Sequence, residues 1–378
     1  MPDAALLRRR LLPDPTDREA LTYWLASRVA VLVVVSAAAW MFAANDSITP
    51  FWQRFNQWDS RHYEAIARVG YDSGQPTGVP LAALLPGFPA TLAALHAVGV
   101  PYLVAGPLVS LVASLVAVLA LNRLGELEGA GVGPRAVALM VTAPPAVFLA
   151  VGYSEALFLA FALPAWLAAR RERWLAAALL TAAACTVRAN GLFLAAALAV
   201  QYLVADGGIR RRGFARLPLL ALPALPVAGY VAHLHAELGT RTAWFDAQRD
   251  GWSRQLTDPV TAFRITWEAA FEPRNELLWQ WTWRYEIVAV LVGVALTAVL
   301  LWRRRWGEAT YTALTIASLA TSTWYFSVPR ALLLQWPLFL LLASWSLRRR
   351  GVVLAWAAVA VPLSALFTAL YATGRWAG

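Results

Sequence analysis

The sequence has one cysteine, no lysine and little charge of either sign. The single cysteine, Cys185, lies in an apolar run, which excludes an intramolecular disulfide and a cysteine metal cluster. Charged residues make up 14% of the 378 residues and hydrophobic residues 60%, whereas soluble domains carry about a quarter of charged residues. This composition excludes an ordinary soluble domain. It predicts an all-α polytopic membrane protein, because helices satisfy their own backbone in lipid.

The charge that is present is basic, with a formal net charge of +10 carried entirely by arginine. In a soluble protein such a charge would suggest nucleic acid as a partner. Here the arginines lie in short loops between apolar runs, so they predict membrane topology and no nucleic acid partner. Neither a low-complexity linker nor an internal repeat divides the chain. We therefore expect a single integral-membrane domain over residues 1–378, in contact with membrane lipids.

The apolar runs are the strongest structural signal. The first run, Leu21 to Ala44, is long enough to span a bilayer and reads as an uncleaved helix, because no cleavage-like site follows a short apolar core. With roughly 17–25 apolar residues per helix as the guide, the chain predicts about eleven transmembrane helices. Their expected centres are Val33, Leu111, Thr142, Ala162, Ala182, Ala197, Ala228, Val294, Ile316, Leu340 and Ala360.

The segment Pro80 to Val98 admits two interpretations, a transmembrane helix or an interfacial helix on the outer surface. Three prolines interrupt it, at positions 80, 86 and 89. If the segment lies on the surface, nearly all arginine clusters fall on one side, which the positive-inside rule assigns to the cytoplasm. We therefore expect an interfacial helix, a cytoplasmic N-terminus and an outer C-terminus in the plasma (inner) membrane. The clusters on the expected cytoplasmic side are residues 8–10, 123 with 135, 170–173, 210–216, 303–305 and 348–350.

This topology leaves two long outer loops, about residues 45–101 and 237–284, with juxtamembrane helices expected in the first. It also leaves three short outer turns, at residues 153–155, 188–191 and 328–330. The unusual polar residues near the ends of the expected helices all fall on this face, although the face was assigned from charge alone. We therefore expect an extracytoplasmic active site. These residues are Asp59, His62, Glu155, Arg188, Asn190 and Arg330.

Asp59 follows Trp58 and opens a short amphipathic stretch that ends at Gly70. One interpretation is a helix cap, since Asp is favoured at helix N-termini. The other is a general base, a carboxylate that takes the proton of an attacking hydroxyl. His62 lies three residues later, on the same helical face. It is either an interfacial polar residue or a group that binds phosphate beside the base.

Arg188 and Arg330 stand in two of the short outer turns. The planar guanidinium group suits phosphate because it donates two parallel hydrogen bonds, although either arginine could merely anchor the end of a helix. Glu155 is either a favourable acid at a helix N-terminus or a second carboxylate in the outer cavity. No cofactor is predicted. A divalent ion between Asp59 and Glu155 stays open, and His233 and His235 lack a third metal ligand.

Five segments, in order along the chain, resemble the PIG-V-type mannosyltransferases, relatives of GPI mannosyltransferase II within the GT-C glycosyltransferase superfamily. A sixth segment, from Ala247-Gln248 to Gly251-Trp252, is also similar. The five segments are Trp58-Asp59 to Tyr71, Leu85-Pro86-Gly87-Phe88-Pro89, Tyr153-Ser154-Glu155, Thr186 to Gly191, and Ser327-Val328-Pro329-Arg330.

The resemblance implies a GT-C-type fold and transfer of mannose, with inversion, from a polyprenyl-phosphate donor on the extracytoplasmic side. It implies that Asp59 is the catalytic base. We then expect Arg188, Arg330 and His62 to bind the donor phosphate. We expect Glu155, Trp58, Tyr63, Tyr153 and Asn190 to position the substrates.

Two rival functions stay open. A flippase or transporter of a polyprenyl-linked sugar or other lipid would suit the helix breaks at Pro144-Pro145 and Asn190-Gly191. Such a protein would place polar residues near mid-membrane and often shows paired halves. The other rival is a membrane scaffold without catalysis. The acceptor, a glycolipid, a glycan or a protein, is not readable from the sequence, and neither is the choice of mannose over another lipid-linked sugar.

Overall fold

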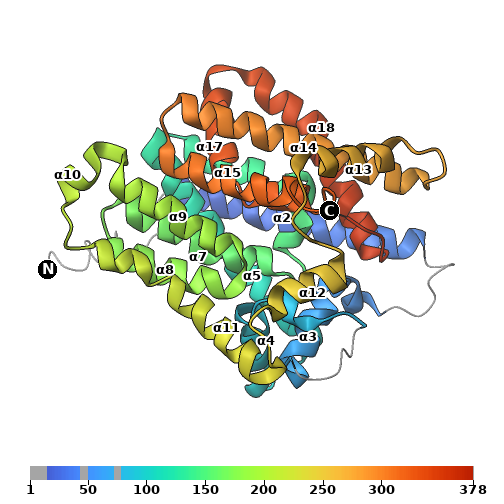
Figure 1. Ribbon diagram of the computed structural model, residues 1–378. Coiled ribbons are helices and arrows are strands. Elements are labelled where there is room, and N and C mark those ends of the chain that lie inside the picture. Colours follow the sequence, from blue (N-terminus) through green and yellow to red (C-terminus); the bar gives the residue numbers. More distant parts are fainter. Residues whose placement is uncertain (1–14, 43–49, 72–77, 378) are drawn as a thin grey trace, which may run out of the picture.

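The computed structural model of the chain describes residues 15–42, 50–71 and 78–377, and it is a bundle of helices (Figure 1). Within these ranges the only β pairing is one isolated antiparallel bridge, between Leu256 and Ser322. The prediction of an all-α protein is confirmed. The expected cytoplasmic cluster Arg8 to Arg10 and the start of the first outer loop lie outside the described residues.

Five helical segments of the described chain are long and apolar enough to cross a membrane. A sixth is formed if α9 and α10, which are bent by 69° at their junction, count as one broken span. These segments identify a multi-pass membrane protein. The five are α2 (Pro15–Met41), α5 (Tyr102–Glu128), Leu217–Leu238, α14 (Leu277–Trp302) and α18 (Arg350–Ala372), and the bent pair is α9 (Asn190–Leu203) with Ala205–Arg212. Leu217–Leu238 comprises η6 (Leu217–Ala221) and α11 (Ala224–Leu238), and Ala205–Arg212 comprises η5 (Ala205–Gly207) and α10 (Gly208–Arg212).

Ten of the eleven expected centres fall inside helices, but several of these helices are short. Helices of 13 to 17 residues reach about 20–26 Å at 1.5 Å per residue, less than the ~30 Å of a hydrocarbon core. The count of eleven spans therefore stays a prediction. The short helices at expected centres are α7 (Ser154–Arg170), α8 (Trp174–Val187), α9, α11, α15 (Trp306–Ala320) and α17 (Trp336–Arg348).

The expected centre at Thr142 is wrong, because this residue lies at a break. Helix α6 (Val132–Val141) ends just before Thr142, and the 3₁₀ helix η4 (Pro144–Leu149) follows. Proline lacks the N–H that a continuing helix needs, and it disfavours a helical conformation in the residue before it. Pro144 and Pro145 therefore stop the helix where hydropathy alone predicts that it continues.

Helix α7 lies at the centre of the bundle, and most of its residues are fully buried. Its Trp166 packs against Trp336 of α17, which in turn stacks on Tyr311 of α15 with ring centroids 4.5 Å apart. Helices α8 and α9 form a tight hairpin beside it. A Cβ atom at Gly191 would lie 2.5 Å from the Cα of Cys185, so this turn requires glycine.

Arginines of the expected cytoplasmic side meet at one end of the bundle. Arg170, at the end of α7, and Arg305, just before α15, both pair with Glu128, the last residue of α5. Ser154 and Glu155, at the start of α7, therefore lie at the opposite end, about 25 Å away for a 17-residue helix. This pairing separates an arginine-rich end from the end that carries the predicted site.

Both expected outer loops contain helices near the predicted site. Helices α3 (Asp59–Val69), α4 (Gly87–Ala97) and α12 (Ala243–Trp252) lie together at the bottom of Figure 1, and α13 (Pro259–Phe271) follows α12. The segment Pro80–Val98 is broken into η3 (Leu81–Ala83) and α4. The 11 residues of α4 reach only about 16 Å, so this segment is too short to span, in agreement with the surface interpretation.

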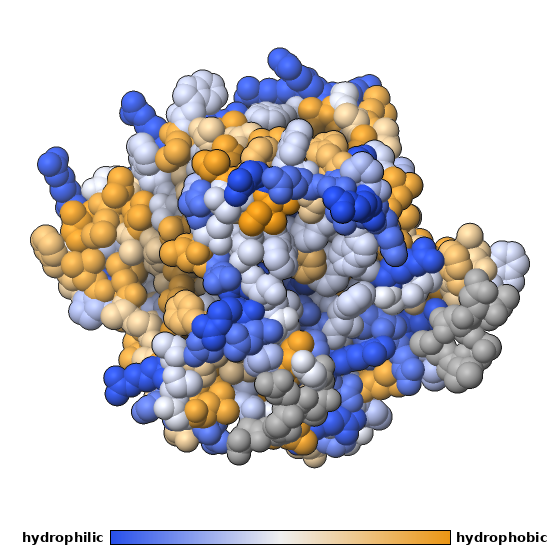
Figure 2. Space-filling view, turned by 45° about the vertical axis from the view of Figure 1, so that its right-hand side comes forward, coloured by the Kyte–Doolittle hydropathy of each residue, from blue (hydrophilic) through white to orange (hydrophobic). Residues whose placement is uncertain are grey.

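The surface of the molecule is divided by polarity. In the view of Figure 2, hydrophilic residues gather in the middle of the face, whereas hydrophobic residues cover its left side. Many large apolar side chains on the long helices are exposed, including Val33 and Trp40 of α2 and Leu291 of α14. Exposed apolar surface of this extent is suited to contact with lipid.

Candidate active site

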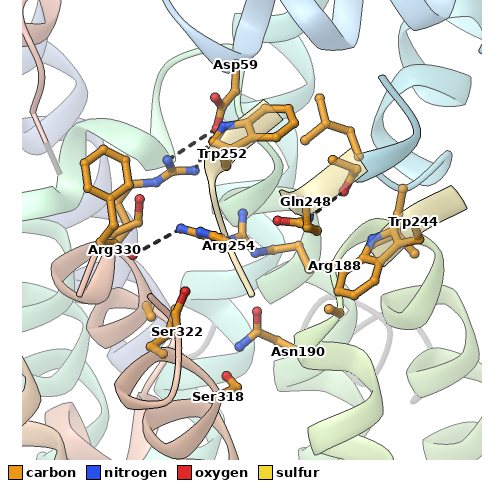
Figure 3. A pocket seen from close by; sticks show the side chains of 18 of the residues that line it. Asp59, Arg188, Asn190, Trp244, Gln248, Trp252, Arg254, Ser318, Ser322 and Arg330 are labelled. Atoms are coloured by element: carbon orange, nitrogen blue, oxygen red, sulfur yellow. Dashed lines mark hydrogen bonds and ion pairs between the residues drawn. The ribbon is translucent and has the colours of Figure 1, made fainter. Parts of the chain in front are cut away.

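A cavity of about 440 Å³ opens between the two expected outer loops, at the end of the bundle opposite Glu128. Figure 3 shows its lining side chains from close by. Its walls come from α3, the turn between α8 and α9, helix α12 and the segment from Ser318 to α16 (Val328–Leu333). Polar and aromatic side chains alternate around it. The lining residues that Figure 3 labels are Asp59, Arg188, Asn190, Trp244, Gln248, Trp252, Arg254, Ser318, Ser322 and Arg330.

Asp59 is the first residue of α3, and its carboxylate lies on the cavity wall. Its backbone N–H donates a hydrogen bond to the hydroxyl of Tyr153 (3.1 Å), while its Oδ2 accepts from Arg330 Nη1 at 3.3 Å. The interpretation of Asp59 as a helix cap is wrong. The N-cap position is Trp58, and no side chain there makes a capping hydrogen bond. The Asp59 side chain is directed at an arginine instead of at the helix backbone.

Arg330 is the centre of the polar network, and only 4% of its surface is exposed. It lies on α16 directly after Pro329, which suits the first turn of a helix because that position needs no N–H partner. The guanidinium carbon lies 4.7 Å from the ring centre of Phe148 and 4.8 Å from that of Tyr153. These cation–π contacts and its two carboxylate partners hold Arg330 in one orientation.

Glu155 is fully buried and joins the two arginines that the sequence singles out. Its Oε1 accepts from Arg188 Nη1 at 2.9 Å and from Arg330 Nη2 at 2.7 Å. Its Oε2 has no hydrogen-bond partner among the residues that the structure describes. Glu155 does not line the cavity, so the expected second carboxylate in the cavity is instead a buried counter-ion behind its wall.

Arg188 and Asn190 come from the turn between α8 and α9, and both line the cavity. Arg188 adopts an extended conformation after the last residue of α8, and its Nη1 also donates to Ser154 Oγ at 2.7 Å. The amide of Asn190 donates to Thr315 Oγ1 at 3.4 Å. The arrangement Asp59–Arg330–Glu155–Arg188 is thus a continuous chain of alternating charges.

The other predicted residues divide into two groups. Tyr63 lines the cavity and donates to Ser154 Oγ at 2.9 Å, and burial raises the pKa of Tyr63 to about 12. Tyr153 and Trp58 do not line the cavity, but both adjoin Asp59. Tyr153 is buried beneath Asp59. Trp58, the residue before Asp59, adopts a positive φ of 53° that is rare for a non-glycine residue.

His62 is not among the cavity-lining residues, so the expectation that it binds the donor phosphate directly is not met by its position. Its ring lies edge-to-face against Trp252, with centroids 5.9 Å apart. Burial lowers the pKa of His62, and the nearby carboxylate of Asp59 offsets this only in part. His62 therefore supports one wall of the cavity from behind Trp252.

The sequence did not predict three residues of this region as site residues. Arg254 lines the cavity after α12, and its only signal was its place two residues after the Gly251-Trp252 pair. Trp376 also lines the cavity and stacks on Phe326, but no sequence feature distinguished it from the interfacial tryptophans. Glu286 is a single acid inside the apolar run of α14, and this could have marked it.

The structure also bears on metal binding. Among the described residues, no three His, Cys, Asp or Glu side chains are grouped to hold a metal ion. Between Asp59 and Glu155, where a bridging ion was left open, lies the guanidinium of Arg330. His233 lies beside the ring of Tyr71, with centroids 5.8 Å apart.

Comparison with known proteins agrees with this picture. Residues 21–205 match the family model described as Mannosyltransferase (PIG-V). A search of curated proteins found no match. The matched range includes Asp59, Glu155 and Arg188, and it supports a mannosyltransferase activity. Over residues 21–205 this chain is similar to the PIG-V mannosyltransferase family, which confirms the resemblance of its motifs.

Proposed function

We propose that the protein transfers mannose, with inversion, from a polyprenyl-phosphate donor to a hydroxyl group of an extracytoplasmic acceptor in the plasma membrane. The observation that carries this proposal is the position of Asp59. It is an acid on the wall of a cavity that Arg188 and Arg330 also line, and it pairs with Arg330. Asp59 also lies within residues 21–205, the range that matches mannosyltransferases.

In the proposed reaction Asp59 acts as the general base. The acceptor hydroxyl enters the cavity and attacks C1 of mannose while Asp59 takes its proton. The bond between C1 and the phosphate oxygen breaks, and its electron pair leaves with the polyprenyl phosphate. A single displacement of this kind inverts the anomeric centre. A positioned base contributes about 10²–10⁴-fold to such a step.

Arg188 and Arg330 have the second role, which is to favour negative charge in the cavity. Both line it, and their N–H groups are oriented before substrate binds, which is the condition for stabilising charge that develops in a transition state. Glu155 is a positioning residue in this scheme, because it holds both guanidinium groups from behind. Tyr63 and Asn190 line the space for the sugar, while Trp58 and Tyr153 fix Asp59.

The cavity wall also suits a donor that carries a lipid. Beside the charged residues it contains large apolar side chains from the turn between α8 and α9 and from the outer loops. A GT-C-type architecture, in which such a cavity opens at the membrane surface, follows from the family resemblance. The acceptor is a glycolipid, a glycan or a protein that presents a hydroxyl group there. The apolar lining side chains are Leu84, Leu85, Val187, Phe193, Phe245 and Leu256.

The test uses purified protein in nanodiscs, radiolabelled polyprenyl-phosphate mannose and a crude membrane extract as the source of acceptor. We expect label to move to a new product with the wild type, and transfer to fall by at least about a hundredfold with Asp59→Asn. The variant should keep the unfolding midpoint of the wild type within a few degrees. Full transfer by Asp59→Asn would reject Asp59 as the base. Donor binding without transfer, together with movement of label across the bilayer of sealed proteoliposomes, would indicate a flippase.

A further inference from the structure

The cavity contains a third arginine, Arg254, which differs from the other two in its partners. Arg188 pairs with Glu155, and Arg330 pairs with Glu155 and Asp59. Arg254 has no carboxylate partner within 4.0 Å among the described residues. The hydrogen bond from its side chain is made by Nη2 to the backbone carbonyl of Phe326, at 3.1 Å. Arg254 is therefore the lining arginine whose charge is not matched by a contacting acid.

The backbone that carries Arg254 is held from both sides, although it belongs to a long loop. Its N–H donates to the carbonyl of Gln248 in α12, at 3.0 Å. On the other side, Thr323 Oγ1 donates to the carbonyl of Ser253 at 2.7 Å, and Leu256 forms the isolated β bridge with Ser322. The arginine is thus a fixed part of the wall, tied to the segment that leads into α16.

The electrostatic surroundings of Arg254 favour the arrival of an anion. Burial, and then the positive charge of Arg330, lower the pKa of Arg254, while Asp59 and Glu286 offset this in part. Glu286 acts without contact, because no ion pair joins it to Arg254 within 4.0 Å in the described part of the chain, and its two oxygens accept the N–H groups of Ser327 (2.7 Å) and Val328 (2.8 Å). An anion in the cavity would therefore relieve the cost of holding this charge.

We infer that Arg254 is the main ligand of the donor phosphate, and that it selects a phosphodiester with a single negative charge over a diphosphate. The inference rests on the proposed function and sharpens it. Arg188 and Arg330 are already paired with contacting acids, whereas Arg254 is not, so Arg254 is the lining arginine left to bind one anionic charge. The polyprenyl-phosphate sugar carries one such charge, whereas a diphosphate donor carries two or more.

The experiment measures equilibrium binding of polyprenyl-phosphate mannose to the protein in nanodiscs, without acceptor. The variants are Arg254→Gln, Arg254→Lys and, as the matched control, Arg249→Gln. Arg249 lies five residues earlier, and it is exposed and paired with Asp246 and Asp250. The neutral polyprenol of the same chain length is the ligand control, because it lacks the phosphate.

We expect Arg254→Gln to weaken binding of polyprenyl-phosphate mannose by about ten- to a hundredfold, the range of a charge-assisted hydrogen bond. Arg254→Lys should lose less, and Arg249→Gln should stay within about twofold of the wild type, as for an exposed ion pair. Binding of polyprenol should be the same in all four proteins. Raising the salt concentration should weaken donor binding to the wild type more than to Arg254→Gln.

Wild-type affinity for the donor in Arg254→Gln would overturn the inference and leave the proposed function standing. An equal loss of polyprenol binding would also overturn it, because the effect would then come from a disturbed cavity. If the unfolding midpoint of Arg254→Gln falls, donor binding by Arg254→Lys is compared with that of the wild type, since lysine keeps the charge. A loss of affinity in Arg254→Lys as large as that in Arg254→Gln would then overturn the inference. If the wild type itself does not bind polyprenyl-phosphate mannose, the proposed function fails first.

Discussion

The two ends of the bundle use the same residue types in opposite ways. At the arginine-rich end, Glu172 pairs with Arg211 and Arg212, and its side chain is 36% exposed. At the cavity end, Glu155 also pairs with two arginines, but its side chain is 0% exposed. Exposed ion pairs contribute little to stability, whereas buried pairs carry a desolvation cost. The comparison teaches that burial, and not residue type, distinguishes a candidate site from a topology signal.

The largest expected effect on stability comes from neutralising the buried acid. Glu155→Gln leaves Arg188 and Arg330 without their shared counter-ion, and removing one partner of a buried pair costs about 3–5 kcal/mol. We expect the free energy of unfolding in detergent to fall by that amount and mannosyl transfer to fall with it. The same change at the arginine-rich end, Glu172→Gln, should cost less, because Glu172 is partly exposed although the side chain of Arg212 is only 4% exposed, and it should leave transfer intact. Equal losses at both ends would remove the distinction between them.

A smaller effect is expected at Glu286, which joins α14 to α16 behind the cavity. Glu286→Gln keeps the size of the side chain but removes the charge that accepts from the N–H groups of Ser327 and Val328. Hydrogen bonds to a charged group contribute about 1.5–3 kcal/mol, so we expect a loss of stability in this range. Because α16 carries Arg330, the turnover number for mannosyl transfer should fall as well.

The matched control is Asp258→Asn, at an exposed cap. Asp258 also accepts from two backbone N–H groups, at the start of α13, but it does not line the cavity. The free energy of unfolding in denaturant and the turnover number for mannosyl transfer are measured for Glu286→Gln and Asp258→Asn. Unchanged turnover in Glu286→Gln, with its stability reduced, would show that α16 keeps its position without this acid.

The smallest expected effect is the pH dependence contributed by His62. Burial lowers the pKa of His62 below its ordinary value of 6.5. The unfolded chain therefore binds this proton more readily than the folded protein does. The contribution of His62 to the free energy of unfolding is complete above about pH 6.5 and is lost as the pH falls through the pKa of the folded protein. We expect His62→Gln to flatten the dependence of the unfolding midpoint between pH 7 and pH 5. His235→Gln, at an exposed position, should not, and an unchanged slope in His62→Gln would contradict the expectation.

Much of this architecture was readable from the sequence, because hydropathy and proline act locally. The apolar runs predicted helices at ten of eleven centres, and Pro80, Pro86 and Pro89 predicted a broken outer segment. The exception, Thr142, shows a limit: apolar composition continues through Pro144 although the backbone cannot. Charge bias also grouped the polar residues at one end, and Asp59, Arg188 and Arg330 indeed line one cavity.

The sequence did not predict how deeply each charged residue is buried or which residue it pairs with. Glu155 reads as a residue of the cavity because it starts a helix, yet the packing of α7 at the centre of the bundle buries it. Arg254 reads as one of several arginines in a long loop, and hydrogen bonds of its segment to residues 321–326 hold it at the cavity. Such contacts join residues about 70 positions apart, and no local pattern encodes them.

One oxygen of Glu155 accepts hydrogen bonds from both Arg188 and Arg330. This shared acceptor constrains which substitutions the three positions can tolerate. Replacing the acid leaves Arg188 without a paired acid and Arg330 with Asp59 alone, whereas replacing either arginine leaves the acid with one partner. No single substitution at the three positions keeps every charge matched, so neutral drift there requires paired changes. Among relatives of this chain, Glu155, Arg188 and Arg330 should therefore be retained together or replaced together. Arg254, which has no acid to strand, can vary alone when the charge of the donor changes.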